Sequence, residues 1–93
     1  MKVFACKNDN SYGGGLIMVA AGSVEEAFIT AAKNRNIDYL FDWTNSKGRW
    51  IKPDWKIEHC SCSTYPLKKW FEMPNLHSDL AEPAVIIEDH YSE

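Results

Sequence analysis

Residues 13–34 of this chain read GGGLIMVAAGSVEEAFITAAKN, which joins a strand pattern to a helix pattern through one glycine and one serine. The part over 16–21 is a continuous apolar run of strand length, which is typical of a strand covered on both faces. After Gly22, apolar residues recur at the spacing of an amphipathic helix, at Val24, Ala27, Phe28 and Ala31. The sequence therefore predicts a strand over 16–21 followed by a helix over 23–34.

Both ends of this predicted helix carry capping signals. Ser23 and Glu26 have capping-box spacing, in which the serine hydroxyl accepts from a free helix amide and the glutamate reaches back to the serine amide. Lys33 lies near the other end, where the helix dipole favours a positive charge. Asn34 or Asn36 could supply the left-handed residue that ends the helix.

Two hairpins are expected around this unit. Residues 2–7 alternate loosely, so they predict an opening strand that pairs with 16–21 across a long loop containing Gly13, Gly14 and Gly15. Residues 49–59 predict a second hairpin that turns at Pro53. The segment 37–43 fits either a short helix or an irregular segment packed on the first helix.

The C-terminal third is expected to add one helical turn and one strand. Pro66 could open a turn over 66–71 that Pro74 ends, and 75–82 has the composition of a surface loop before a strand over 84–87. We expect a single α+β domain over 1–88 and an acidic tail over 89–93. Its mainly antiparallel sheet of about five strands would carry the helix over 23–34 on one face.

Composition limits the class of protein. The 93 residues, 45% of them hydrophobic, are enough for one core, and a net charge of -3 disfavours general binding to nucleic acid. Neither a signal peptide nor a run of about 20 apolar residues is present, so no membrane segment is expected. Three cysteines without a secretion signal indicate a reducing compartment, and we expect a cytoplasmic protein.

Chemical motifs are weak. The three glycines precede a strand and no Gly-Lys-Ser/Thr follows them, so a phosphate loop is disfavoured. His59, Cys60 and Cys62 concentrate three potential metal ligands, but a second ligand pair is missing, and two small buried thiols explain the cysteines equally well. Metal or small-ligand binding at these residues stays an alternative. No spacing selects a catalytic pair, so we predict a protein that is not an enzyme and has no cofactor.

The richest surface signal lies over 43–56, where indoles alternate with cations. Aromatic residues and arginine dominate protein interfaces, which favours a non-enzymatic interaction module of the adaptor or inhibitor type. Single-stranded nucleic acid is a further alternative, because bases stack on aromatic rings beside cations. The partner is expected to be a protein, and an exposed strand edge could also pair two copies of the chain. The predicted contact residues are Trp43, Lys47, Arg49, Trp50, Lys52, Trp55 and Lys56.

Overall fold

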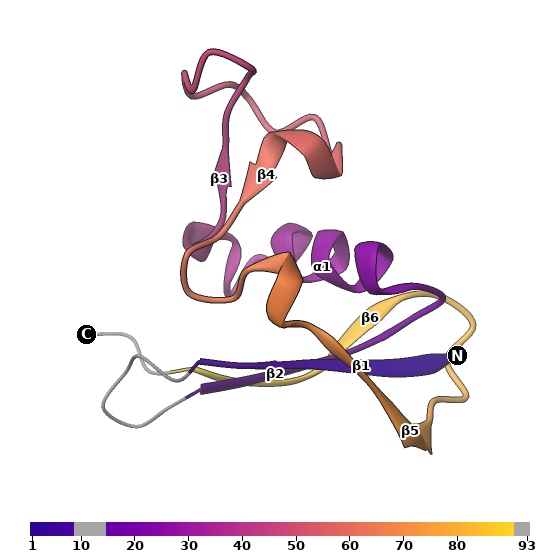
Figure 1. Cartoon of the computed structure of the whole chain (residues 1–93). Coiled ribbons are helices and arrows are strands. Elements are labelled where there is room, and N and C mark those ends of the chain that lie inside the picture. The colour runs from indigo at the N-terminus through magenta and orange to yellow at the C-terminus, as the bar shows by residue number, and fades with distance from the viewer. Residues whose placement is uncertain (9–14, 91–93) are drawn as a thin grey trace.

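The computed structural model of the chain describes residues 1–8 and 15–90, with side chains described up to residue 87 (Figure 1). Gly13 and Gly14 of the predicted loop, and residues 91–93 of the predicted tail, lie outside this part. A single α-helix lies above a sheet, and a slender extension rises beyond the helix (Figure 1). The predicted α+β class is therefore confirmed.

The main sheet has four antiparallel strands in the order β5-β1-β2-β6. β1 (Lys2–Lys7) and β2 (Gly15–Ala21) form the predicted hairpin, and β6 (Ala84–His90) adds to the free side of β2. β5 (Phe71–His77) pairs with β1. A second sheet has two short strands, β3 (Asp42–Trp43) and β4 (Cys60–Ser61), so the chain has six described strands in two sheets rather than about five in one.

The helix α1 (Val24–Lys33) lies where the sequence predicted it. The Ser23 hydroxyl accepts from the Glu26 amide at 3.2 Å, as expected for an N-cap. The Glu26 carboxylate accepts from the Gly22 amide at 2.7 Å, one residue before the amide that the capping box predicted. Asn34 has an extended backbone (φ -70°, ψ 124°) and Asn36 has no positive φ, so the prediction of a left-handed residue at either position was wrong. The Asn34 amide instead donates to the Ala31 carbonyl, which closes the last turn.

The core fills the space between α1 and one face of the main sheet. Since strand side chains alternate between faces, every second residue of β1 and β2 points to the helix. Phe28 is the largest helix residue in this core, and its ring meets Phe41 edge to face at 5.4 Å between centroids. The other members from these elements are Phe4, Cys6, Ile17, Val19, Ala21, Ala27, Ala31 and Ala32.

Residues 37–43 contain the short 3-10 turn η1 (Asp38–Leu40) before β3, and the ring of Phe41 packs against Phe28 of α1. This fits the second predicted alternative, an irregular segment packed on the helix. The turn predicted over 66–71 is the short η3 (Leu67–Lys69), and the chain then enters β5, which runs through Pro74 to His77. The expected loop over 75–82 is therefore wrong in its first part. Pro74 is tolerated because it lies in the irregular stretch between Glu72 and His77, where β5 has no paired residue in β1.

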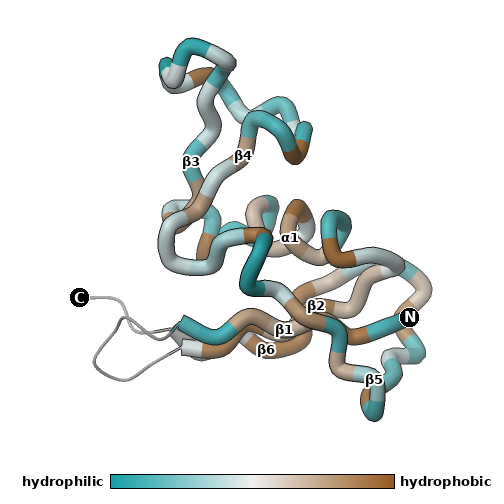
Figure 2. Tube along the Cα trace, in the orientation of Figure 1, coloured by the Kyte–Doolittle hydropathy of each residue, from teal (hydrophilic) through white to brown (hydrophobic). Residues whose placement is uncertain are grey.

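The predicted hairpin over 49–59 is also wrong. β3 pairs with β4, so the chain forms one longer projection over 42–61, which we call the arm (Figure 1). A single bridge between Thr44 and Trp50 closes the top of the arm, and η2 (Ile57–His59) leads back into β4. The Ile51 amide still donates to the Trp43 carbonyl, and the pairing ends before Pro53, which lacks the amide that a strand ladder needs. Hydrophilic residues cover most of the top of the arm, whereas hydrophobic residues dominate the strands of the sheet (Figure 2).

Among the described residues, no helix combines the length and the apolar character that crossing a membrane would need.

Candidate interaction surface on the arm

The tip of the arm is a turn held by its own hydrogen bonds. The Asn45 side-chain oxygen accepts from the amides of Lys47 at 2.9 Å and Arg49 at 3.1 Å. The Asn45 amide donates to the Arg49 carbonyl at 3.0 Å, and the Gly48 amide donates to the Asn45 carbonyl at 2.9 Å. Gly48 has a φ of 74°, which glycine adopts without a steric penalty. The turn is therefore a fixed platform, and it sets the position of Trp50.

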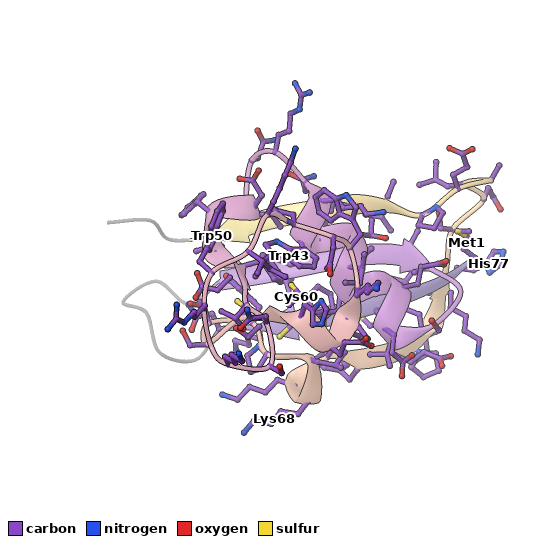
Figure 3. The ribbon with its side chains drawn as sticks, turned by 90° about the horizontal axis from the view of Figure 1, so that it is seen from above. Met1, Trp43, Trp50, Cys60, Lys68 and His77 are labelled. Carbon is purple, nitrogen blue, oxygen red and sulfur yellow. The ribbon has the colours of Figure 1, made fainter. Side chains whose placement is uncertain are left out.

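Trp50 is the most exposed tryptophan of the chain, with 71% of its surface accessible. It lies at the margin of the molecule when seen from above, whereas Trp43 lies further inside (Figure 3). Within the described part of the chain, the Trp50 side chain has no ring contact and no hydrogen bond. The indole is thus free to contact another molecule.

Three cationic residues lie within three positions of Trp50 in the sequence. Lys47, Arg49 and Lys52 are all exposed, and none of them forms an ion pair with a described residue. Their charges are therefore not neutralised within the described structure, although the whole chain is acidic. The tip of the arm therefore exposes three cations and one indole.

Trp43 does not belong to that surface. Only 4% of it is accessible, and its ring packs edge to face against Trp55 with 5.1 Å between centroids. The Trp43 carbonyl accepts from the Ile51 amide at 3.0 Å, which holds the returning chain against β3. The prediction of Trp43 as a contact residue is therefore corrected: its large apolar area forms the inside of the arm.

Trp55 belongs to the arm, and its ring faces the helix α1. It is 45% accessible, and the Lys33 ammonium of α1 lies 5.1 Å from the centroid of its ring, within the range of a cation–π contact. Lys56, the next residue, is exposed. Trp55 and Lys56 thus lie at the base of the predicted surface, away from the tip of the arm.

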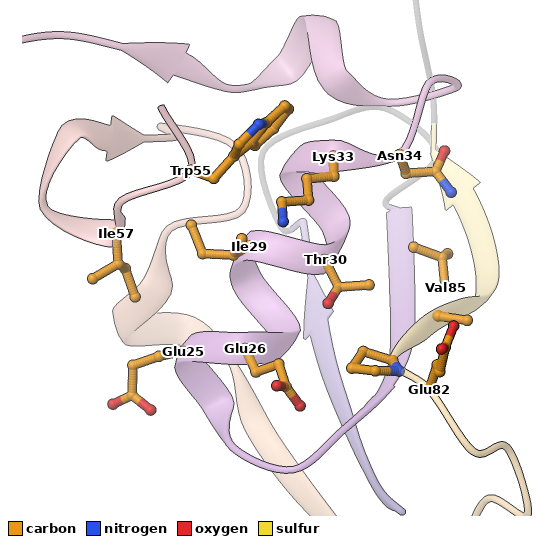
Figure 4. A pocket seen from close by; sticks show the side chains of 12 residues that line it. Glu25, Glu26, Ile29, Thr30, Lys33, Asn34, Trp55, Ile57, Glu82 and Val85 are labelled. Atoms are coloured by element: carbon orange, nitrogen blue, oxygen red, sulfur yellow. The ribbon is translucent and has the colours of Figure 1, made fainter. Parts of the chain in front are cut away.

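An open groove of about 930 Å³ runs along α1 at the base of the arm (Figure 4). Trp55 and Ile57 form one side, Ile29 of α1 lies in the middle, and Val85 of β6 forms the other side. The carboxylates of Glu25, Glu26 and Glu82 also line it. Sequence reasoning missed this groove, because its walls come from three separate segments.

The side chains of the predicted metal ligands, His59, Cys60 and Cys62, make different contacts from one another. His59 Nδ1 lies 2.5 Å from Asp54 Oδ2, and this hydrogen bond is the main cause that lowers the pKa of Asp54. Cys62 Sγ donates to the Leu40 carbonyl at 3.0 Å and accepts from the Tyr65 amide at 3.2 Å. Among the described residues, no group of three or more His, Cys, Asp or Glu side chains could hold a metal ion.

Both thiols of this group are buried. Burial, reinforced by the neighbouring Cys62, raises the pKa of Cys60 to about 12, and burial likewise raises the pKa of Cys62. A thiolate is the form that attacks substrates or binds metals, so these environments disfavour both roles. Their positions match the reading of Cys60 and Cys62 as small buried residues.

Comparisons of the chain with protein-family models, with curated proteins and with solved structures find no match.

Proposed function

We propose that the chain is a non-enzymatic protein-interaction module that binds its partner through the tip of the arm. The contact surface consists of Lys47, Arg49, Trp50 and Lys52, with Trp55 and Lys56 at its base. The observation that supports this most directly is the 71% exposure of Trp50 on a turn that its own hydrogen bonds fix.

The energetics favour this surface as a binding site. A tryptophan can bury about 150 to 250 Å² of surface, and tryptophan and arginine are the residues most enriched among those that dominate binding energy. Because the turn over 45–49 is already closed, binding would order little additional backbone. Trp50 and Arg49 are adjacent, so one partner pocket could engage both.

The charges indicate the chemistry of the partner. Lys47, Arg49 and Lys52 carry three positive charges without described counter-charges, so an acidic protein surface fits them best. Complementary charges raise the association rate and are screened by salt. Binding through this surface should therefore weaken as the salt concentration rises.

Single-stranded nucleic acid is supported less well. Base stacking needs free aromatic faces, and only Trp50 presents one fully at the tip. Trp55 has Lys33 over its ring and Trp43 against it, so neighbouring residues already occupy much of its surface. A run of stacked bases would need a second platform next to Trp50.

The test compares three forms of the immobilised protein in an extract of its source cells. The double variant R49A/W50A should lose a protein that the wild type retains, with affinity reduced at least about 30-fold if Trp50 dominates the contact. The control is Tyr39→Ala, which removes an exposed aromatic ring outside the arm. Circular dichroism verifies that each variant is folded.

The result that contradicts the proposal is equal retention of the same proteins by wild type and R49A/W50A. A parallel measurement of fluorescence anisotropy with a labelled 12-nucleotide single strand addresses the alternative. Binding of that strand, lost in R49A/W50A, would assign the same surface to nucleic acid instead.

A further inference from the structure

The groove along α1 is lined in part by apolar side chains. Ile29, Ile57 and Val85 pack against the core and stay partly accessible. Trp55, which also lines the groove, is 45% accessible. The volume of about 930 Å³ is within the range of sites that hold a drug-sized ligand. A bulky apolar side chain from another molecule therefore fits into it.

Three carboxylates make the rim of this groove acidic. Glu25 and Glu26 belong to the first turn of α1, and Glu82 lies on the side of β6 (Figure 4). All three residues are exposed, and neither ion pair between described residues includes any of them. The hydrogen bond that Glu26 accepts from the neutral Gly22 amide leaves its charge in place. Lys33 carries the one positive charge among the described lining residues, so negative charge is in excess.

The tip of the arm has the complementary composition. Trp50 presents a large apolar ring, and the exposed cations around it form no ion pair with a described residue. The tip thus joins one indole to three positive charges, whereas the groove joins apolar walls to three negative charges. Each surface of this chain has the charges that would neutralise the other.

The tip cannot fill the groove of its own chain. The turn over 45–49 lies at the far end of the arm, which rises away from α1, whereas the groove lies along α1 at the base of the arm (Figure 1). The pairing of β3 with β4 and the bridge between Thr44 and Trp50 keep the arm extended. Any contact between the two surfaces must therefore join two chains.

We propose that the tip of one copy binds in the groove of a second copy. Trp50 covers the apolar lining, and the cations beside it meet the carboxylates of the rim. This inference rests on the proposed function, because it names the partner of the same surface. The cations of the tip fit an acidic protein surface best, and the groove is such a surface on the chain itself.

Such a contact joins two different surfaces, so it is heterologous. A pair of copies still has one unused tip and one unused groove, and association continues with rising concentration unless a ring closes. One turn in one groove buries less than a standard interface of about 1,600 Å², so the association should be weak and reversible. Because opposite charges contribute to it, salt should weaken it further.

The test is sedimentation equilibrium of the full chain at about 10 to 500 µM. The weight-average mass of the wild type should rise above that of the monomer with concentration, and fall when salt is raised from about 0.05 to 0.5 M. R49A/W50A loses the tip, and E25K/E82K reverses two charges of the groove. Each variant alone should stay monomeric, with a dissociation constant at least about 30-fold higher.

An equimolar mixture of the two variants separates this contact from other modes of association. R49A/W50A keeps an intact groove, and E25K/E82K keeps an intact tip. The mixture should therefore form a complex of one copy of each, although neither variant associates alone. This complex should not grow beyond two chains, because its remaining tip and its remaining groove are both defective.

The matched control is D38K/E72K, which makes the same change in net charge at two exposed carboxylates outside the groove. It should associate like the wild type. A wild type that is monomeric throughout would overturn the inference, as would a mixture that stays monomeric or undiminished association of either variant. Should E25K/E82K fail to fold by circular dichroism, Glu82→Lys alone, outside the helices and strands, replaces it.

The extract experiment on the proposed function has a separate outcome. Since R49A/W50A keeps its groove, retention of the chain itself is left out of that comparison. A monomeric wild type that retains another protein, which R49A/W50A loses, would overturn this inference and leave the proposed function in place. A monomeric wild type that retains the same proteins as R49A/W50A would contradict both.

Discussion

At the scale of single residues, Trp55 has an unusual backbone conformation for a bulky side chain. Its φ is 61°, and it is the one residue other than glycine with a positive φ among those described. A bulky side chain in this left-handed region costs about 1 to 2 kcal/mol. The edge-to-face contact with Trp43 and the Lys33 ammonium over the ring offset that cost. The strain lies at the junction of the arm and the helix.

Substitution of Trp55 by alanine and by glycine should separate the backbone strain from the ring contacts. Both variants lose the indole, but W55G relieves the positive φ, so W55G should be more stable than W55A by about 1 kcal/mol. Lys56, with an ordinary φ of -96°, is the control. There the order should reverse, with K56G less stable than K56A by about 0.4 to 1 kcal/mol. Urea unfolding measures all four, and the same order at both sites would contradict the prediction.

At the scale of elements, α1 depends on the residues just before it. The Ser23 hydroxyl satisfies the Glu26 amide, and the Glu26 carboxylate reaches back to the Gly22 amide. Two backbone amides that the helix itself cannot satisfy are thus paired. The helix begins at Val24 because this exchange fixes the turn from β2 into α1.

Ser23→Ala should lower the free energy of unfolding by about 1 kcal/mol, because the Glu26 amide loses its acceptor. The control is Ser63→Ala, at an exposed serine outside the helices and strands, which should change stability by less than about 0.5 kcal/mol. Urea unfolding followed by circular dichroism gives both values. A Ser23→Ala protein as stable as Ser63→Ala would mean that the cap contributes nothing in solution.

At the scale of the whole molecule, the arm and the body share one core. Trp43 and Cys60, from the two strands of the arm, belong to the same buried cluster as Phe28 of α1 and Phe4 of β1. The base of the arm therefore cannot lose its packing without exposing part of the main core. This arrangement predicts one cooperative unit rather than a body with an independently melting extension.

Thermal unfolding should therefore show the same midpoint by two probes. Tryptophan fluorescence reports mainly on the arm, which holds Trp43, Trp50 and Trp55, whereas far-ultraviolet circular dichroism reports on α1 and the sheets. Both are measured at one protein concentration, because association would shift the midpoint. Trp50→Phe, which removes an indole already exposed in the native state, should leave the midpoint unchanged. A fluorescence transition that precedes the loss of circular dichroism would contradict the prediction.

Local patterns determined much of the fold. The strands near 2–7, 16–21 and 84–87, the helix over 24–33 and its Ser23 cap could all be predicted, because each depends on residues within a few positions of one another. The basic and aromatic character of the arm was also readable. The predictions failed for the segments that depend on distant pairing. β5 continues past Pro74 because residues on both sides of the proline pair with β1, and β3 pairs with β4 across the whole arm.

Tertiary structure alone decided which side chains are exposed and which are buried. Trp43 and Trp50 have the same chemistry and neighbouring places in the sequence, yet one is 4% and the other 71% accessible. The groove beside α1 likewise combines segments that lie far apart in the chain. A sequence pattern records the period of a segment but not the register in which segments pair. Burial follows from that register, so the surfaces became visible only in the folded chain.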